Sequence, residues 1–445
     1  MNGPEGEVAD HDGTRGRAGA AAVGRPVVID GRSPPLTSHD LHADVLGLRR
    51  RVPRGATVAL VGQSSRLVAS AIVALEGWAA RVEFVGDLSP TVGSAEAVVL
   101  REAGDDAPAA AYASHGELSA GDASTDVHTL WRVFSSGTTG TPTPTDHSLD
   151  SLTRRIRPVR PARNPGEREQ RRWGLLFSPT RMAGIQVVLQ AIHGDTLVDA
   201  HHAAGLDERL QLFAGAGVDA LSATPTMWRM ILRSRACDDL RLQQITLGGE
   251  IATQSLINAL RRRFDARVTH VYASTEAGAA FSVSDGREGF PRHFLEPAPG
   301  RVALEIRDGV LFVRAPGSST AQPDGFVCTG DLVEPRGDRV YFVGRKSQTV
   351  NVGGDKVSPE RVEELIRRHP AVHDAVVTPR RSPITGWILT ARVVPSPLGS
   401  GLDPDELQSA LRSFVADHLP RSHTPASITA VTEFFLSPTG KVSRA

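Results

Sequence analysis

The sequence predicts an α/β fold, in which a large N-terminal domain of stacked α/β subdomains and a β region precede a small α+β C-terminal domain. Three features predict it: a strand–helix–strand unit at residues 58–85, a second α/β stretch at 173–283, and a change of character after Arg345. Short apolar strands that alternate with helices favour parallel sheets covered by helices. We expect a disordered tail over 1–25, a large domain over 26–345 and a small domain over 346–445.

The first unit begins with the apolar run 58–61, which predicts a short buried strand. Residues 62–65, Gly-Gln-Ser-Ser, are typical of a turn, and residues 67–78 have the apolar content of a helix. Residues 81–85 predict the second strand. The composition of 101–127, rich in Ala, Gly, Asp and Ser, indicates a long exposed connection.

The remaining elements follow from the same patterns. The second stretch has strands at 218–221, 244–247 and 267–271, a helix after Pro225 and another helix at 254–264. Alternating apolar residues between 300 and 343, as at 302–306 and 310–313, predict an antiparallel β region. Ser358 and Pro359 favour a helix start, with Ser358 as N-cap, and Val362, Leu365 and Ile366 form that helix's apolar stripe. The small domain is completed by strands at 375–377, 387–394 and 427–431 and a helix at 405–418.

Composition excludes several classes of protein. The chain has 445 residues and a formal net charge of zero, so it lacks the basic surface of a nucleic-acid-binding protein. Its two cysteines, Cys237 and Cys328, cannot build a disulfide framework, and no Cys/His cluster has zinc-ligand spacing. No apolar run has the length of a signal core or of a membrane span. We expect a soluble cytoplasmic protein with no nucleic-acid or membrane partner.

Lysine use singles out the end of the chain. Lys346, Lys356 and Lys441 are the only lysines among 50 lysine and arginine residues. Lys441 follows a Pro-Thr-Gly turn at 438–440. Lysine is a compact point charge that suits a developing negative charge, whereas arginine is planar and always charged. A frayed, solvated tail is the alternative interpretation of this segment.

Several loops carry side chains suited to nucleotides. The strand 131–134 enters Ser135-Ser136-Gly137-Thr138-Thr139-Gly140, whose backbone N–H groups and hydroxyls could hold a phosphate, although the loop is not a Walker A motif. The segment Tyr272-Ala273-Ser274-Thr275-Glu276 offers an aromatic face, hydroxyls and a carboxylate for magnesium. Asp331, in Thr329-Gly330-Asp331, could accept both hydroxyls of a ribose. For each segment the alternative is an ordinary turn.

The order and spacing of these segments, with Gly248-Gly249-Glu250, Gly344-Arg345 and 438–441, resemble the superfamily of AMP-forming acyl and aryl ligases. That superfamily contains acyl-CoA synthetases, nonribosomal-peptide adenylation domains and luciferases. The resemblance covers roughly residues 50 to 445. It implies that a carboxylate attacks the α-phosphate of ATP·Mg²⁺, giving an acyl-adenylate and pyrophosphate. The small mobile domain then rotates, and a thiol of coenzyme A or phosphopantetheine displaces AMP.

The resemblance also implies a role for each matching residue. Lys441, Thr275 and Glu276 would be catalytic, with Glu276 as the magnesium ligand. The hinge would lie at Ser347, and Gly353 and Gly354 would line the thiol channel. Arg181, Gly184 and His270 would lie in the acid pocket. The ATP and AMP contacts would be Ser135, Ser136, Gly137, Thr138, Thr139, Gly140, Gly248, Gly249, Glu250, Tyr272, Ala273, Ser274, Asp331 and Arg345.

The sequence departs from the superfamily's pattern at four places. Thr143 stands where the phosphate loop usually has lysine, so a cation for the β- and γ-phosphates is missing there. Ala273 replaces a glycine, and Ser347 replaces the usual Asp or Lys of the hinge. The acceptor-side loop, which usually has an aromatic residue and a histidine before a small residue and a glycine, here reads Thr180-Arg181-Met182-Ala183-Gly184. A pocket arginine would suit a dicarboxylate or a polar aromatic acid, and an arginine folded over the surface is the alternative.

The sequence therefore predicts an ATP-dependent, AMP-forming ligase that transfers an aryl or small polar acyl group to a thiol, most simply that of coenzyme A. Three other functions remain open: transfer to a carrier protein or an amine, adenylation of an unusual oxyacid such as nitrite, and a nucleotide-binding regulatory relative without turnover. The sequence does not identify the acid, the acceptor or the oligomeric state.

Overall fold

A computed structural model describes residues 25–434 except 32, 88–93, 95, 102–126, 136–141, 160–169, 275–277, 299–301, 315–323 and 384–385. The tail predicted over 1–25 falls almost wholly outside the described residues, and so does most of the connection predicted over 101–127. None of the described helices combines the length and the apolar content that crossing a membrane requires.

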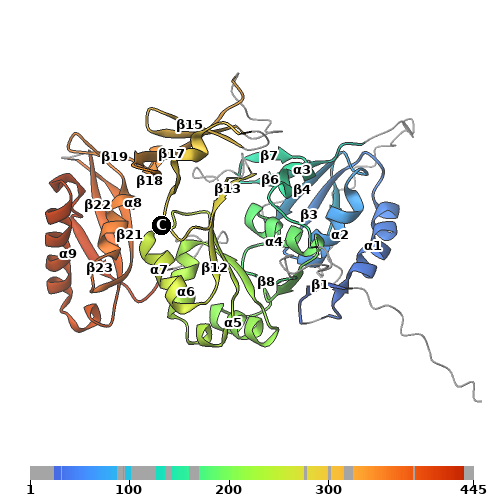
Figure 1. The fold of residues 1–445 in the computed structure, drawn as a ribbon, viewed down its shortest axis with the longest axis horizontal. Coiled ribbons are helices and arrows are strands. Elements are labelled where there is room, and N and C mark those ends of the chain that lie inside the picture. The colour runs from blue at the N-terminus through green and yellow to red at the C-terminus, as the bar shows by residue number, and fades with distance from the viewer. Residues whose placement is uncertain are drawn as a thin grey trace, which may run out of the picture.

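Two largely parallel sheets form the body of the large domain (Figure 1). In sheet order, the five-stranded sheet contains β5 (Val98–Leu100), β3 (Thr57–Val61), β4 (Arg81–Gly86), β6 (Leu130–Phe134) and β7 (Pro144–His147). The eight-stranded sheet contains β13 (Gly278–Val283), β12 (Arg267–Ser274), β11 (Gln244–Gly248), β10 (Ala220–Ala223), β8 (Arg172–Leu175), β9 (Thr196–Asp199), β1 (Pro26–Ile29) and β2 (Leu36–Thr37).

The helices of the large domain cover these sheets. They are α1 (Ser38–Arg51), α2 (Ser65–Leu75), α3 (Leu149–Thr153), α4 (Met182–Ile192), α5 (Leu206–Gly215), α6 (Pro225–Arg233) and α7 (Gln254–Arg263), with 3-10 turns at Arg235–Asp239 (η2) and Arg292–Leu295 (η3). Ser64 caps α2, because its hydroxyl accepts the Leu67 N–H at 3.1 Å.

One apolar core joins the two sheets. Buried side chains of β3 and β4, such as Leu60 and Phe84, belong to the same cluster as Leu175 of β8, Leu197 of β9 and Ile185 of α4. A second core, centred on Trp228 of α6, lies under α5, α6 and α7. The central strands β9 and β10 contribute side chains to both cores, Leu197 and Ala220 to the first and Val198 and Leu221 to the second, so these strands are buried on both faces.

The β region is a separate antiparallel sheet. Its strands are β14 (Phe290–Pro291), β18 (Arg339–Arg345), β17 (Val327–Arg336), β16 (Val310–Arg314) and β15 (Ala303–Arg307). Arg339 is almost fully buried. Its guanidinium pairs with Asp285 at 2.6 Å and donates to the carbonyls of Arg287, Glu288 and Gly289. This one side chain therefore fixes the loop after β13 to the sheet.

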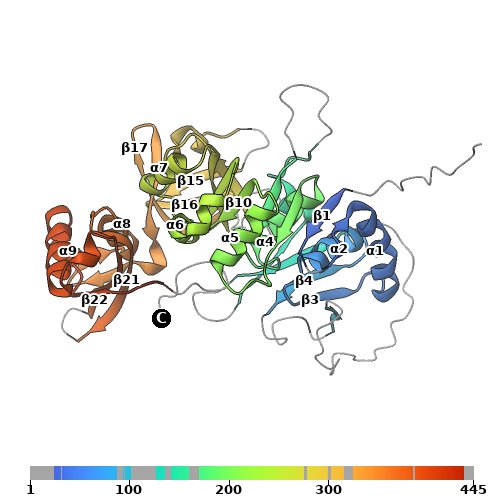
Figure 2. The same cartoon turned by 90° about the horizontal axis from the view of Figure 1, so that it is seen from below.

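The C-terminal domain lies to one side of the large domain (Figures 1 and 2) and has its own apolar core. It follows a 3-10 turn, η4 (Lys346–Gln348), at the end of β18. Its elements are β19 (Val350–Val352), β20 (Asp355–Val357), α8 (Pro359–Arg367), β21 (Val372–Ser382), β22 (Gly386–Pro395), η5 (Gly399–Gly401), α9 (Pro404–His418), η6 (Arg421–His423) and β23 (Ser427–Ala430).

The predicted fold class is confirmed, and the differences from prediction are local. The first helix spans 65–75 rather than 67–78, because Gly77 has φ +67° and turns the chain. The strand predicted at 218–221 begins at Ala220, since the Val218 N–H still bonds to the Phe213 carbonyl of α5. Ser358 occupies the N-cap position of α8 without capping it, and its hydroxyl donates to Glu360 at 2.8 Å.

Replacing Arg339 tests the role of this buried guanidinium. Arg339→Met should lower the free energy of unfolding by several kcal/mol, because each buried acceptor left unpaired costs roughly 1–3 kcal/mol. Arg287→Met is the matched control, because it removes an exposed pair with Asp338 and should change stability little. Urea unfolding measures both variants. Equal midpoints for the two would show that Arg339 does not fix the loop.

Candidate active site

The structure describes only part of the predicted site. Eight predicted residues lie outside the described part of the chain: Ser136, Gly137, Thr138, Thr139, Gly140, Thr275, Glu276 and Lys441. Their roles stay predictions. Among the described residues, no group of three or more His, Cys, Asp or Glu side chains could hold a metal ion. Magnesium binding by Glu276 therefore also stays a prediction.

The two ends of the predicted phosphate loop are described, and they lie together. Ser135 follows β6, and its N–H donates to the Thr143 carbonyl at 2.9 Å. The Thr143 N–H in turn donates to the Ser135 hydroxyl at 3.4 Å. Because β6 runs parallel to β4, this loop leaves the carboxyl edge of a parallel sheet, where α/β proteins bind ligands.

A carboxylate between the sheets is fixed by two partners. Asp331, on β17, is buried with 8% of its surface exposed. One carboxylate oxygen accepts the Arg345 Nε–H at 2.7 Å, and the other accepts the Tyr272 hydroxyl. Asp331 and Arg345 are direct cross-strand neighbours on β17 and β18, whereas Tyr272 comes from β12. The structure thus brings together three residues that the sequence assigned to one nucleotide site.

The Tyr272 ring belongs to an aromatic cluster. Its centroid lies 5.1 Å from that of Phe281 and 5.2 Å from that of Phe342, with nearly parallel rings. Burial raises the pKa of the phenol well above its usual value, and the Asp331 charge adds to the effect. The hydroxyl therefore stays protonated at neutral pH and donates to Asp331. Stacking of this ring on an adenine stays a prediction, as do the contacts of Ala273 and Ser274 beside it.

The Gly248-Gly249-Glu250 segment follows β11. Gly249 has φ +79°, a conformation that favours glycine. The Glu250 carboxylate accepts the Thr226 N–H at 2.9 Å, in the first turn of α6. An anion is favourable at this helix end, because the first N–H groups have no partner within the helix. Glu250 therefore links the predicted adenine side of the site to α6.

The predicted acid-pocket residues face different parts of the fold. Arg181 immediately precedes α4, and its Nη1 donates to the Phe134 carbonyl at 3.2 Å, at the base of the phosphate loop. Burial lowers the pKa of its guanidinium, partly offset by Asp87. His270 Nε2 donates to the Arg287 carbonyl at 3.0 Å, in the Arg339 loop. An added Cβ at Gly184 would overlap the Ser178 carbonyl, so close packing explains that glycine.

These contacts do not form one acid pocket. Arg181 donates to the carbonyl of Phe134, the last residue of β6, whereas His270 contacts the loop that Arg339 holds. The assignment of Arg181, Gly184 and His270 to the acid pocket therefore stays a prediction.

The predicted thiol-channel glycines lie in the turn between β19 and β20. Gly353 and Gly354 have φ +59° and +104°, and Asn351 Oδ1 accepts the Gly354 N–H at 2.8 Å. A Cβ on either glycine would meet no atom within 4 Å. The turn therefore faces open space in this domain arrangement. Ser347, the predicted hinge residue, lies in η4 just after Arg345.

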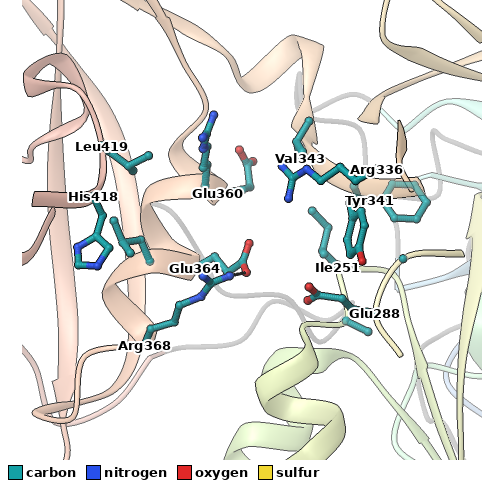
Figure 3. A pocket seen from close by; sticks show the side chains of 15 residues that line it. Ile251, Glu288, Arg336, Tyr341, Val343, Glu360, Glu364, Arg368, His418 and Leu419 are labelled. Atoms are coloured by element: carbon teal, nitrogen blue, oxygen red, sulfur yellow. Dashed lines mark hydrogen bonds and ion pairs between the residues drawn. The ribbon is translucent and has the colours of Figure 1, made fainter. Parts of the chain in front are cut away.

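A cavity of about 260 Å³ lies between the large domain and the C-terminal domain (Figure 3). Its walls come from the segment after Glu250, from β18, and from α8 and the end of α9. The lining residues are Ile251, Ala252, Glu288, Gly289, Arg336, Tyr341, Phe342, Val343, Glu360, Arg361, Glu364, Leu365, Arg368, His418 and Leu419. Both acidic and basic side chains line this cavity, and two of them, Arg368 and Glu364, form an ion pair at the end of α8.

Two residues help to join the domains: Gly344, which the sequence analysis placed in a motif, and Arg229, which it missed. Gly344 has φ +135°, and a Cβ there would overlap the Ser358 hydroxyl at the start of α8. Arg229 of α6 lies 3.8 Å from Asp374 of β21. The glycine that precedes Arg345 in the sequence was a signal for the close approach of Gly344 to Ser358. Nothing in the sequence distinguishes Arg229 among so many arginines.

These features define an α/β protein with a small C-terminal domain and with its predicted nucleotide-site residues beside the junction of the two domains. The chain belongs to the AMP-binding enzyme family, whose model matches residues 68–308. The model of the AMP-binding enzyme C-terminal domain matches residues 361–441. Both matches agree with the resemblance drawn from the motifs.

Relatives and solved structures agree with the family. A probable non-canonical nonribosomal peptide synthetase of Salinispora arenicola is 30% identical over 46% of this chain, which spans only 3% of that protein. A 4-coumarate–CoA ligase of Halorhodospira halophila is 26% identical over 71% of this chain and 75% of its own length. The fold resembles an anthranilate CoA ligase solved with anthranoyl-AMP, with TM-score 0.74, 17% identity, and coverage of 94% and 92% of the two chains.

The Arg181 contact yields a prediction about nucleotide binding. If this guanidinium acts at the phosphate loop, Arg181→Met should weaken ATP binding about tenfold, because a hydrogen bond to a charged group contributes roughly 1.5–3 kcal/mol. AMP, which lacks the β- and γ-phosphates, should bind with nearly unchanged affinity. Titration calorimetry with each nucleotide measures the difference.

The control for this variant is Arg172→Met, because Arg172 also donates to a backbone carbonyl, that of Ala216, at an exposed position. It should leave both affinities unchanged. If Arg181→Met altered the Michaelis constant for the acid alone, the acid-pocket assignment would be correct instead.

Proposed function

We propose that this protein is an ATP-dependent, AMP-forming ligase that adenylates an aryl or small polar carboxylic acid and transfers the acyl group to a thiol. Membership of the AMP-binding enzyme family supports the adenylation step. The observation that carries the proposal is the Asp331 carboxylate, held by Arg345 and Tyr272 where β12, β17 and β18 meet.

The geometry at Asp331 suits a ribose. A carboxylate can accept about four hydrogen bonds, so Asp331 can bind two vicinal hydroxyls while Arg345 holds its orientation. Arg345 is the last residue of β18, and its side chain is half-exposed. Asp331 would thus fix the sugar, and the loop that begins at Ser135 would hold the phosphates.

Adenylation needs charge neutralisation and in-line positioning more than covalent help. Mg²⁺, with Glu276 as its proposed ligand, would supply part of the positive charge at the triphosphate. Lys441 would bridge the attacking carboxylate and the nucleotide oxygens. Thr275 and the loop hydroxyls would bind the phosphates, and Arg181 would add a cation that Thr143 does not provide.

The acceptor is the open part of the proposal. Coenzyme A is the simplest thiol, and the similarity to a 4-coumarate–CoA ligase over most of both chains favours it. A phosphopantetheine on a carrier protein is the second candidate, favoured by the similarity to a nonribosomal peptide synthetase. An amine acceptor, an oxyacid such as nitrite, and a regulatory protein without turnover are the remaining alternatives.

A pyrophosphate-release screen tests the function. The purified chain is incubated with ATP·Mg²⁺ and aryl, short-chain, dicarboxylic or inorganic oxyacids, each with and without coenzyme A. We expect release that depends strictly on an aryl or small polar acid, and a thioester product when coenzyme A is present. Release with no acid in the panel would favour the regulatory alternative.

The Lys441→Ala variant separates the two half-reactions. Removing one electrostatic group of this kind costs on the order of a hundred- to a thousand-fold in rate, so adenylation should fall by that amount. With preformed acyl-adenylate and thiol, the same variant should transfer the acyl group at a near-normal rate. Lys356→Ala, in the exposed strand β20, is the control for loss of a lysine. Equal slowing of both half-reactions would assign Lys441 a structural role.

A further inference from the structure

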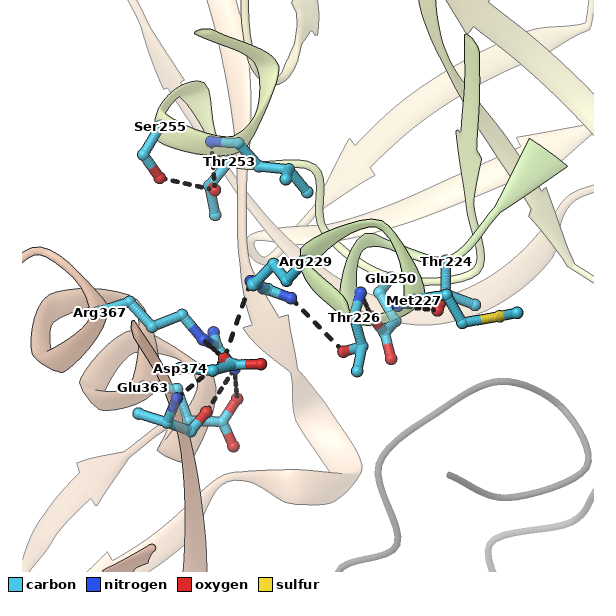
Figure 4. A network of polar contacts seen from close by, with 12 residues as sticks. Thr224, Thr226, Met227, Arg229, Glu250, Thr253, Ser255, Glu363, Arg367 and Asp374 are labelled. Atoms are coloured by element: carbon cyan, nitrogen blue, oxygen red, sulfur yellow. Dashed lines mark hydrogen bonds and ion pairs between the residues drawn. The ribbon is translucent and has the colours of Figure 1, made fainter. Parts of the chain in front are cut away.

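A cluster of charged side chains is buried between the two domains (Figure 4). Arg229 projects from α6 of the large domain, and its Nε lies 3.8 Å from Asp374 Oδ1 on β21 of the C-terminal domain. The two side chains are only 11% and 6% exposed. Charged side chains are rarely buried to this extent unless they are paired.

The C-terminal domain holds Asp374 firmly on its own side. Arg367 Nε donates to the same Asp374 oxygen at 2.6 Å, and Arg367 also pairs with Glu363 at 3.2 Å. Glu363 in turn accepts the Val377 N–H at 3.0 Å. Burial alone would raise the pKa of Asp374, but Arg229 and Arg367 outweigh burial and leave the pKa below its usual value. The carboxylate is therefore ionised at neutral pH.

The large domain connects Arg229 to the predicted adenine side of the site. Arg229 Nη1 lies 3.5 Å from the Thr226 hydroxyl, one turn earlier on α6. The Thr226 N–H donates to Glu250, the last residue of the Gly248-Gly249-Glu250 segment. A continuous series of contacts thus runs from Glu250 through α6 to Asp374, as the dashed lines of Figure 4 show.

The pair also borders a second cavity between the domains, of about 700 Å³. Arg229 and Asp374 line it together with Thr432, Glu433 and Phe434, the last residues that the structure describes. Lys441 follows Phe434 by seven positions in the sequence. The charged contact therefore lies beside the last described residues of the C-terminal domain, which precede the proposed catalytic Lys441 in the sequence.

The energetics of this pair differ between domain arrangements. With the domains packed as described, removing Asp374 would leave the buried Arg229 guanidinium without its carboxylate partner, which is strongly unfavourable. If the C-terminal domain turns away, water solvates Arg229, and Arg367 still satisfies Asp374. The pair therefore contributes little to the folding of either domain and favours one arrangement of the two domains.

We propose that Arg229 is a positioning residue, whose pair with Asp374 holds the C-terminal domain in the arrangement described here and makes that arrangement respond to nucleotide at the Gly248–Glu250 segment. The inference rests on the proposed function for its reaction step. In this arrangement a Cβ on Gly353 or Gly354 would meet no atom within 4 Å, so the turn makes no close contact with the described part of the large domain. The pair should therefore favour adenylation over transfer to the thiol.

Fluorescence energy transfer between the domains tests the arrangement directly. Donor and acceptor dyes are attached at Leu46→Cys and Leu398→Cys, which are 65% and 64% exposed on the two domains, in a Cys328→Ser background. We expect Arg229→Met to broaden the distribution of transfer efficiency. ATP·Mg²⁺ should shift this distribution in the parent protein but not in the variant. Arg235→Met, at an exposed position just after the same helix, should behave as the parent.

Half-reaction rates supply the second measurement. Adenylation by Arg229→Met should be about tenfold slower, because close charge pairs at interfaces couple by roughly 1.5 kcal/mol or more. Acyl transfer from preformed adenylate should stay within about twofold of the parent. Arg229→Lys should recover part of the adenylation rate. The double variant with Arg229→Met and Asp374→Asn should adenylate at nearly the same rate as Arg229→Met alone.

Three results would overturn the inference. One is an unchanged energy-transfer distribution in Arg229→Met; another is equal slowing of both half-reactions. The third is a lowered melting temperature for Arg229→Met alone, which would make the residue structural. If no acid supports adenylation, the proposed function fails, but the energy-transfer measurement still decides whether Arg229 positions the domain.

Discussion

The pairing of Asp331 with Arg345 fixes the geometry on which the rest of the site depends. The two residues are opposite each other on β17 and β18, and Arg345 is the last residue of β18. The same contact therefore orients the carboxylate that we propose binds the sugar, and it anchors the start of the connection to the C-terminal elements. Tyr272 adds a third element, β12, through its hydroxyl.

The proposed reaction requires a dry, preorganised site for the first step and access for a thiol in the second. A domain arrangement held only by apolar packing would be costly to change. The contact between α6 and β21 is ionic instead, and its partners gain water when they separate. An interface of this kind is specific in its geometry and still reversible, which would suit the domain rotation that the proposed two-step reaction requires.

The arginine-rich composition has a structural consequence. Arg339 organises the loop after β13, Arg367 organises the C-terminal domain, and Arg181 contacts the base of the phosphate loop. A guanidinium has five donors in a fixed plane, so each can satisfy several carbonyls and carboxylates at once. Where lysine is retained instead, at position 441, a flexible point charge is what the proposed chemistry needs.

The sequence by itself determined the fold class, most of the regular elements and the nucleotide motifs. Apolar periodicity and turn residues are local signals, and the order of the motifs is carried by the chain itself. The local errors, at α2 and β10, arose because glycine turns and backbone hydrogen bonds set the element ends.

The tertiary structure alone decided which side chains meet. It brought Tyr272 to Asp331 and turned Arg181 toward the base of the phosphate loop. It also buried Arg229 against Asp374, residues separated by much of the chain. No periodicity records such contacts, because they depend on how distant elements pack and on which charges lose their water. One arginine among many becomes a positioning residue only when packing buries it beside a carboxylate of the other domain.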